Sequence, residues 1–123
     1  MALTVNHPTL KEARFGVFST SIGGTPVACY GGIPYRGQIT KITAVQNAAI
    51  TTANCTVTVA INGTTVTGLG FTIPFSGSAA GSITSVTPTA AVYVNEDDVI
   101  TFTPSGASGA SVGCEFTTSV QMA

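Results

Sequence analysis

Residues 54–67 constrain the fold more than any other stretch of the chain. Apolar side chains occupy every second position and alternate with small or hydroxyl-bearing ones, the pattern of a strand with one buried face: Cys55, Val57, Val59 and Ile61 against Thr56, Thr58 and Ala60. Asn62 and Gly63 follow directly, and both tolerate the positive φ angles of a type I′ turn. Residues 64–67 then resume an extended pattern. The segment predicts a β-hairpin centred on Asn62 and Gly63.

Further short strands are predicted at a spacing of about 8 to 12 residues, which is typical of a sandwich or a barrel. They cover residues 38–45, 71–75, 82–86, 93–94, 99–103 and 112–122. Either face of residues 38–45 could be buried, and Pro74 places residues 71–75 at a sheet edge or a strand end. Almost no helix is expected. The predicted fold is all-β, an antiparallel two-sheet sandwich that is jelly-roll-like.

Residues 1–36 follow no such pattern, because proline and glycine interrupt it at residues 7–8, 23–26 and 31–34. Residues 9–14 could form at most a turn or two of helix. We therefore expect an extended N-terminal arm over residues 1–36 and a β-sandwich domain over residues 37–123. Two roles for the arm stay open: it docks on a partner, or it adds a strand to its own sandwich.

Charged residues are scarce, at 7% of the chain against about 25% in ordinary soluble domains. Only four side chains are Lys or Arg, too few for the basic patch that nucleic-acid binding needs. The sequence lacks both an apolar run of about 18 residues and the pattern of a secretory signal. We expect no nucleic-acid or membrane partner and synthesis in a cytoplasm. A net charge of -1 leaves copies little mutual repulsion, which favours a role in an assembly.

Residues that could support catalysis or bind a metal are few and poorly spaced. The one histidine, His7, lies in the arm, so any catalytic triad would depend on it. The acidic cluster at residues 96–98 lacks the spacing of a calcium loop, and Asp98 is expected to cap a turn instead. Three cysteines without CxxC spacing are expected to be buried thiols: Cys29, Cys55 and Cys114. We predict no enzyme activity, no metal and no cofactor.

The arm supplies most of the candidate contact residues, because a segment with apolar and basic side chains needs a partner to become ordered. These candidates are Leu10, Lys11, Arg14, Phe15 and Phe18. A second group combines aromatic side chains and a charge with glycines, outside any clean strand pattern: Tyr30, Tyr35 and Arg36. The tyrosines, Tyr93 included, could instead stack on a sugar or a base, although packing in a core or an interface is the expected use.

Five segments from residue 37 onward follow one another in a characteristic order. They are GQITKITAV (37–45), TVTVAINGT (56–64), SAAGS (78–82), VTPTAA (86–91) and VNEDDVI (94–100). This order resembles the small β-sandwich decoration, or cement, proteins of tailed-phage capsids. Related sequences often carry glycine at the position of Asp97, and residues 1–36 have no counterpart. The resemblance implies a trimer at three-fold or quasi-three-fold positions of the shell, with no cofactor and no reaction.

On this resemblance we expect a capsid decoration protein that binds the outside of an assembled phage head and stabilises it by bridging capsomers. The implied partners are the major capsid protein and other copies of this chain in a homotrimer. The implied location is the outer surface of the virion. A receptor- or carbohydrate-binding module of a tail fibre or spike is the alternative, since a β-sandwich suits that role equally well.

Overall fold

The computed structural model describes residues 12–107 and 109–122. One five-stranded sheet, sheet A, has the order β1-β10-β3-β7 with β8 also paired to β3, and sheet B has the order β2-β9-β4-β5 with β6 also paired to β4. All pairs are antiparallel. The predicted all-β, two-sheet sandwich is confirmed. The strands are β1 (Glu12–Ser19), β2 (Cys29–Gly32), β3 (Gly37–Gln46), β4 (Cys55–Ile61), β5 (Thr64–Thr65), β6 (Phe71–Ile73), β7 (Ile83–Val86), β8 (Tyr93–Val94), β9 (Val99–Ser105) and β10 (Cys114–Met122).

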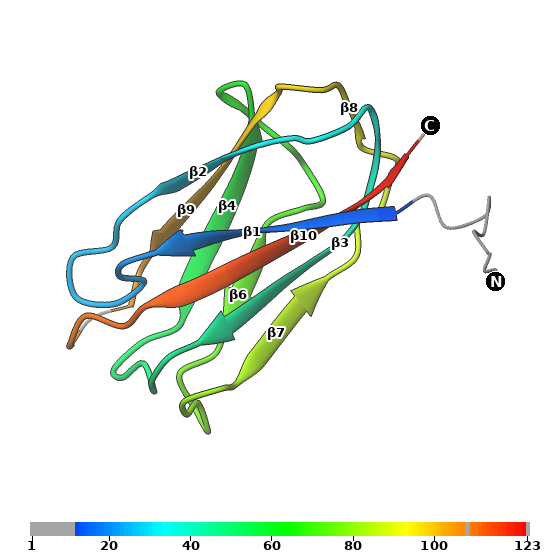
Figure 1. The fold of residues 1–123 in the computed structure, drawn as a ribbon. Helices are drawn as coiled ribbons and strands as arrows, with labels where there is room; N and C mark the ends of the chain where they lie inside the picture. Colours follow the sequence, from blue (N-terminus) through cyan, green and yellow to red (C-terminus); the bar gives the residue numbers. More distant parts are fainter. Residues whose placement is uncertain (1–11, 108, 123) are drawn as a thin grey trace, which may run out of the picture.

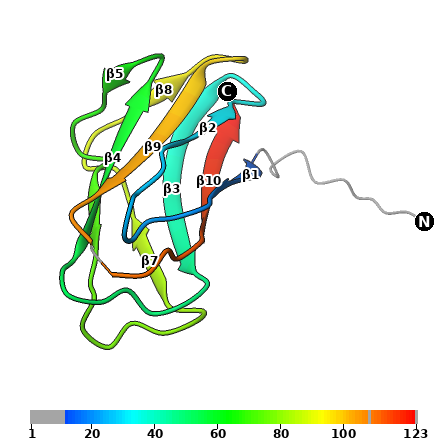
Figure 2. The same ribbon diagram turned by 90° about the vertical axis from the view of Figure 1, so that its left-hand side faces the viewer.

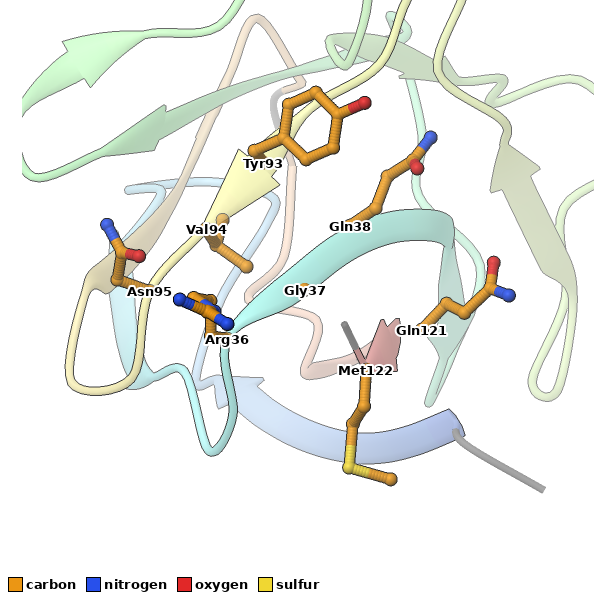
Figure 3. Close-up of a pocket in the computed structure, with 8 residues that line it drawn as sticks. All are labelled: Arg36, Gly37, Gln38, Tyr93, Val94, Asn95, Gln121 and Met122. Carbon is orange, nitrogen blue, oxygen red and sulfur yellow. The ribbon is translucent and has the colours of Figure 1, made fainter. Parts of the chain in front are cut away.

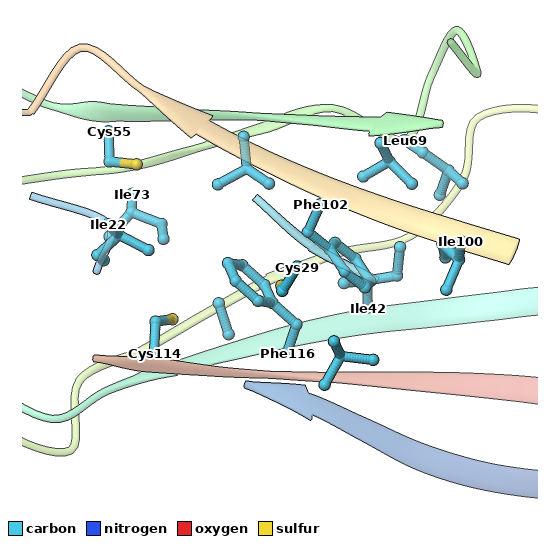
Figure 4. Packing of buried hydrophobic residues seen from close by; sticks show 14 of the residues in the cluster. Ile22, Cys29, Ile42, Cys55, Leu69, Ile73, Ile100, Phe102, Cys114 and Phe116 are labelled. Atoms are coloured by element: carbon cyan, nitrogen blue, oxygen red, sulfur yellow. The ribbon is translucent and has the colours of Figure 1, made fainter. Parts of the chain in front are cut away.

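The two sheets face each other across one apolar core (Figure 1, Figure 2). Phe102 of β9 and Phe116 of β10 stack between the sheets, with ring centroids 4.7 Å apart and ring planes at 4° (Figure 4). Phe71 of β6 meets Phe116 edge to face, with centroids 6.2 Å apart. Phe102 and Phe116 are fully buried, and each such burial is worth about 1.5–3 kcal/mol. An aromatic contact between the sheets therefore fixes the centre of the sandwich.

The hairpin and the edge strand predicted around residues 54–75 are both confirmed. Burial alternates along β4 with its apolar face inward. The chain turns from β4 into β5 through Asn62 and Gly63, whose φ angles are 51° and 84°, as a type I′ turn requires. β6 ends at Ile73, directly before Pro74, and lies at an edge of sheet B.

A β-bulge in β3 settles which face of residues 38–45 is buried. Ile39 and Ile42 are both buried, although a regular strand would point them to opposite faces. Ile39 and Lys41 pair with consecutive residues of β10, so Thr40 is one extra residue on β3. The bulge therefore lets both halves of the strand bury isoleucine in the same core.

Residues 12–36 contribute two strands to the sandwich, which is the second of the two roles left open for the expected arm. β1 pairs with β10 over its whole length, and β2 pairs with β9. Val17 of β1 is buried and Phe15 packs against the core. Gly31 of β2 permits this approach, since a Cβ at Gly31 would collide with the Val17 side chain. Residues 12–14, where a helical turn was possible, are extended. Residues 1–11 lie outside the described part of the chain.

The loops gather at two ends of the sandwich, which differ in charge. The first, here called the uncharged end, lies at the lower left of Figure 1 and carries residues 20–28, 47–54, 74–82, 106–107 and 109–113, without any Asp, Glu, Lys or Arg. The second, the polar end, carries residues 33–36, 62–63, 66–70, 87–92 and 95–98, with the start of β1 and the end of β10. Its charged residues are Glu12, Arg36, Glu96, Asp97 and Asp98.

Candidate functional site

A groove of about 700 Å³ runs along the side of the sandwich between the edge strands β1 and β2. Within the described residues, β1 pairs only with β10 and β2 only with β9. Apolar side chains line this flank groove, among them Phe15, Phe18, Val27 and Tyr30. Phe18 is 47% exposed and Tyr30 is 67% exposed. Edge strands beside an apolar groove offer unpaired backbone groups and side-chain pockets to a further strand.

The structure brings together part of the first group of contact candidates. Phe15 and Phe18 line the flank groove from β1. Phe18 points outward, whereas Phe15 is half-buried and packs inward against the core. Arg14 is exposed on the outer face of sheet A. Leu10 and Lys11 lie outside the described residues.

The second group of candidates is divided between two places. Tyr30 joins Phe15 and Phe18 in the flank groove. Tyr35 and Arg36 are exposed in the loop between β2 and β3, at the polar end. Arg36 also lines a pocket at that end.

This polar pocket has a volume of about 410 Å³ and lies where β8, β3 and β10 meet (Figure 3). Gln38 lies directly opposite both Tyr93 and Gln121, so these three side chains form a row on one face of sheet A. The lining is completed by Arg36, Gly37, Val94, Asn95 and Met122. Figure 3 shows the Gln38 and Gln121 amides on neighbouring strands and the Tyr93 ring on the far side of Gln38.

Gly37 allows the polar pocket to form. A Cβ at this position would collide with the carbonyl oxygen of Gln121 and would lie 3.0 Å from Cγ1 of Val120. Any side chain at residue 37 would therefore push β3 away from β10. The row that places Gln38 beside Gln121 depends on this close approach.

Glu12 and Arg14 pair with each other beside the polar pocket. Nη2 of Arg14 lies 3.3 Å from Oε1 of Glu12, and both side chains are exposed. The Thr40 hydroxyl donates a hydrogen bond of 3.2 Å to Oε2 of Glu12. This is the one salt bridge in the described part of the chain, so Arg36 has no carboxylate partner there. An exposed pair of this kind contributes only about 0–1 kcal/mol to stability.

The acidic turn at residues 95–98 is structural, as expected for Asp98. The backbone N–H of Asn95 donates to Oδ2 of Asp98 at 2.8 Å, and Nδ2 of Asn62 donates to Oδ1 at 3.0 Å. These bonds favour the carboxylate and lower the pKa of Asp98, the Asn95 bond most strongly. Asp97 has a φ of 70°, a conformation that glycine adopts without strain. In the described residues, no three His, Cys, Asp or Glu side chains are grouped as a metal site needs.

The three thiols are buried and free, as predicted: Cys29, Cys55 and Cys114. Burial raises the pKa of Cys114 to about 12 and that of Cys29 to about 11, with smaller contributions from neighbouring acidic groups. Burial also raises the pKa of Cys55. A thiol nucleophile needs a lowered pKa and access to solvent, so these groups serve as apolar packing.

Sequence reasoning missed most of the polar pocket. Gln38, Asn95 and Gln121 were not singled out, and Tyr93 was considered only as one of several possible stacking residues. These residues come from separate strands and loops that meet only through the β8-β3-β10 pairing. Of the residues that line this pocket, only Arg36 was named from the sequence as a contact candidate.

Nothing helical in the described residues has the length and apolar character of a membrane-crossing segment.

No protein-family model and no curated protein matches the sequence. Solved structures do match the fold. A chain of the acidic stable capsid structure of Helicobacter pylori bacteriophage KHP30 aligns with 88% of this chain and 89% of its own length, at a TM-score of 0.54 and 10% identity. A chain of the cyanophage Pam1 capsid asymmetric unit aligns with 100% of this chain and 94% of its own length, at a TM-score of 0.53 and 11% identity. The sandwich is therefore a fold that this chain shares, over nearly its whole length, with chains of two phage capsid structures.

Proposed function

We propose that this chain is a decoration protein that binds the outside of an assembled phage head and stabilises it by bridging capsomers. The observation that carries the proposal is the match to chains of two phage capsid structures, over 89% and 94% of their lengths. The likeness spans whole subunits of similar size, not one domain of a larger shell protein. A small sandwich added to a lattice suits this role, because binding only to the assembled state stabilises that state by mass action.

We place the contact with the shell at the flank groove. Phe18 and Tyr30 are large side chains left in water at its rim, and neighbouring Val27 is exposed as well. Exposed apolar grooves on soluble domains commonly mark interaction sites. The occupant is an extended segment of the major capsid protein, which would add a strand to the free edge of β1 or β2 and cover the aromatic rim.

Binding to particles tests this proposal. Purified chain is mixed with heads of its phage that lack it, and the fraction that sediments with the particles is measured. We expect saturable binding and a higher temperature for DNA release. The double substitution Phe18→Ala with Tyr30→Ala should weaken binding roughly tenfold or more, as expected for loss of buried aromatic anchors. Tyr93→Ala, an equally exposed change at the polar end, is the matched control. A chain that stays in the supernatant at every concentration refutes the proposal.

Truncation tests the role of the first residues separately. Removing residues 2–11 leaves every described strand in place, whereas removal up to residue 18 would delete most of β1 and uncover Val17. If Leu10 and Lys11 contact the shell, the shorter truncation weakens binding while its melting temperature stays unchanged. Full binding by the truncated chain would restrict the contact to the flank groove.

We further propose that three copies act together and that no catalytic step is involved. Linked copies would bind a three-fold position far more tightly than one copy, because each later contact is intramolecular. Light scattering on the purified chain measures the copy number directly. If the chain is a monomer at all concentrations and still binds heads, the proposed trimer is wrong and the proposed decoration role is unaffected.

A further inference from the structure

The polar pocket presents hydrogen-bonding groups that the protein does not use. Its amides belong to Gln38, Asn95 and Gln121; Asn95 contributes its backbone N–H to the turn, and none of the three side-chain amides bonds another described residue. A neutral amide both donates and accepts hydrogen bonds. A sugar hydroxyl does the same, so three amides around one hollow match a ligand rich in hydroxyl groups.

Apolar surface in the same pocket suits the other side of a sugar ring. Tyr93 is 75% exposed and stands in the same row as Gln38, whereas Val94 is almost fully buried, so the ring of Tyr93 supplies the apolar surface. Binding pockets for small molecules of about 300–1,000 Å³ typically combine such surface with a few placed polar groups. An aromatic ring with a polar tip can cover the C–H face of a pyranose while its hydroxyl stays in water.

Arg36 adds a positive charge that has no carboxylate partner among the described residues. Arg14, near the same end of sheet A, is paired with Glu12, and the Asp98 carboxylate is bonded to Asn95 and Asn62. A guanidinium binds a carboxylate through two parallel hydrogen bonds, which fix its orientation. At the pocket itself the charge of Arg36 favours a carboxylate on the ligand, although the carboxylates of Glu12, Glu96, Asp97 and Asp98 at the same end of the sandwich oppose it.

We propose that the polar pocket binds a short acidic glycan. Arg36 holds a carboxylate of the sugar, Gln38 and Gln121 bond its hydroxyls, and Tyr93 lies against a ring face. The site is separate from the flank groove, so a subunit seated through that groove would keep the pocket open to solvent. Glycan binding does not depend on decoration and can be measured on the isolated chain.

Titration of the full chain with digalacturonate tests the proposal, with nuclear magnetic resonance as the readout. The side-chain amide signals of Gln38 and Gln121 and the ring signals of Tyr93 should shift together and saturate. The methyl-esterified disaccharide has the same rings without the charges and should bind roughly tenfold more weakly or worse, as expected for a lost charge-assisted bond.

Two substitutions separate the site from general charge effects. Arg36→Gln should weaken digalacturonate binding roughly tenfold or more, whereas Arg14→Gln, on β1 at the same end of the sandwich, should leave it unchanged. Both side chains are exposed, so melting temperatures should match that of the wild type. The proposal is overturned by an absence of site-specific shifts, by equal binding of the acid and its ester, or by an unaffected Arg36→Gln variant. Competition by acetate at equal concentration would also overturn it, because any small anion would then suffice.

Discussion

The loops of the uncharged end are tied together by serine hydroxyls, whereas those of the polar end are tied together by a carboxylate. At the uncharged end, Oγ of Ser19 donates to the carbonyl of Val27 at 2.7 Å. Ser78 accepts a hydrogen bond from the backbone N–H of Ile50 at 3.0 Å. At the polar end, Asp98 accepts hydrogen bonds from two loops at once. The same sandwich is therefore closed by neutral groups at one end and by an ion at the other.

This difference means that acid and alkali should act on opposite ends of the molecule. The bonds of Asp98 require its ionised form, so acid weakens the polar end. Cys55 and Cys114 occupy the first positions of β4 and β10 at the uncharged end, whereas Cys29 begins β2 opposite Phe102, at the centre of the core. All three are buried as neutral groups, so alkali weakens the uncharged end and the core beside it. Serine hydroxyls do not titrate between acidic and alkaline pH, so the hydrogen bonds that they make are kept at both.

The largest effect is expected from Gly37→Val, which should open the polar end. The new side chain would collide with the Gln121 carbonyl, and overpacking of this kind costs about 3 kcal/mol. Urea unfolding followed by circular dichroism measures the loss. Gly32→Val is the control, because a Cβ at Gly32 meets nothing within 4 Å. Similar losses for the two variants would show that the contact of β3 with β10 does not fix the polar end.

Alkaline destabilisation should come next in size. The folded pKa values of Cys114 and Cys29, about 12 and about 11, exceed the ordinary value of 9.0. The thiol contribution is therefore present below about pH 9 and is lost as the pH rises, by roughly 1.4 kcal/mol per thiol and pH unit. Urea unfolding at about pH 8 and about pH 9.5 measures it. Cys114→Ala should show a shallower loss between these pH values; a loss equal to that of the wild type would contradict the assignment.

Ser19→Ala should weaken the uncharged end by about 1–3 kcal/mol, because it removes the hydrogen bonds that the buried Ser19 hydroxyl makes to the carbonyls of Ser21 and Val27. The loss should be the same at acidic and neutral pH, since no charge is involved. Thermal melts at both pH values provide the measurement, with the exposed Ser85→Ala as control. A loss that varies with pH would break the distinction between the two ends.

The smallest effect is expected from Asp98→Asn at the polar end. The folded pKa of Asp98 is lowered, so its stabilisation is present above the unfolded pKa of about 3.9 and is lost as the pH falls through the folded value. The variant should melt slightly below the wild type at neutral pH, and the two curves should converge in acid. Glu96→Gln controls for the removal of one negative charge. A difference that persists at low pH would mean that the carboxylate is not the active group.

Features that depend on neighbours along the chain were predictable from the sequence, and features that depend on distant strands were not. The turn at Asn62 and Gly63 follows from what two adjacent residues tolerate. β1 also alternates inward residues, Phe15 and Val17 among them, but charges at its start and the glycines that follow hide the pattern. Its partner β10 lies at the other end of the chain.

The polar pocket shows the same limit more strongly. Gln38 has an ordinary place in a strand, and nothing near it in the sequence distinguishes it. It becomes part of a site only because β8 and β10 pair on either side of β3 and bring Tyr93 and Gln121 into its row. The bulge at Thr40 could not be predicted from the sequence of β3 for the same reason, because a register shift depends on how two strands pair.

The lack of charged residues in the loops of the uncharged end affects how salt acts on a contact made there. Dissolved salt acts on proteins chiefly by screening charge, and over a distance of about 10 Å at 0.1 M ionic strength. Phe18 and Val27 lie where the flank groove reaches the uncharged end; no Asp, Glu, Lys or Arg occurs in the loops beside them, and Glu115, opposite Phe18 on β10, is the one charged residue paired with either. A contact made there releases few counterions and loses little attraction to screening. The affinity of a partner bound through this surface would therefore change little between low and high ionic strength.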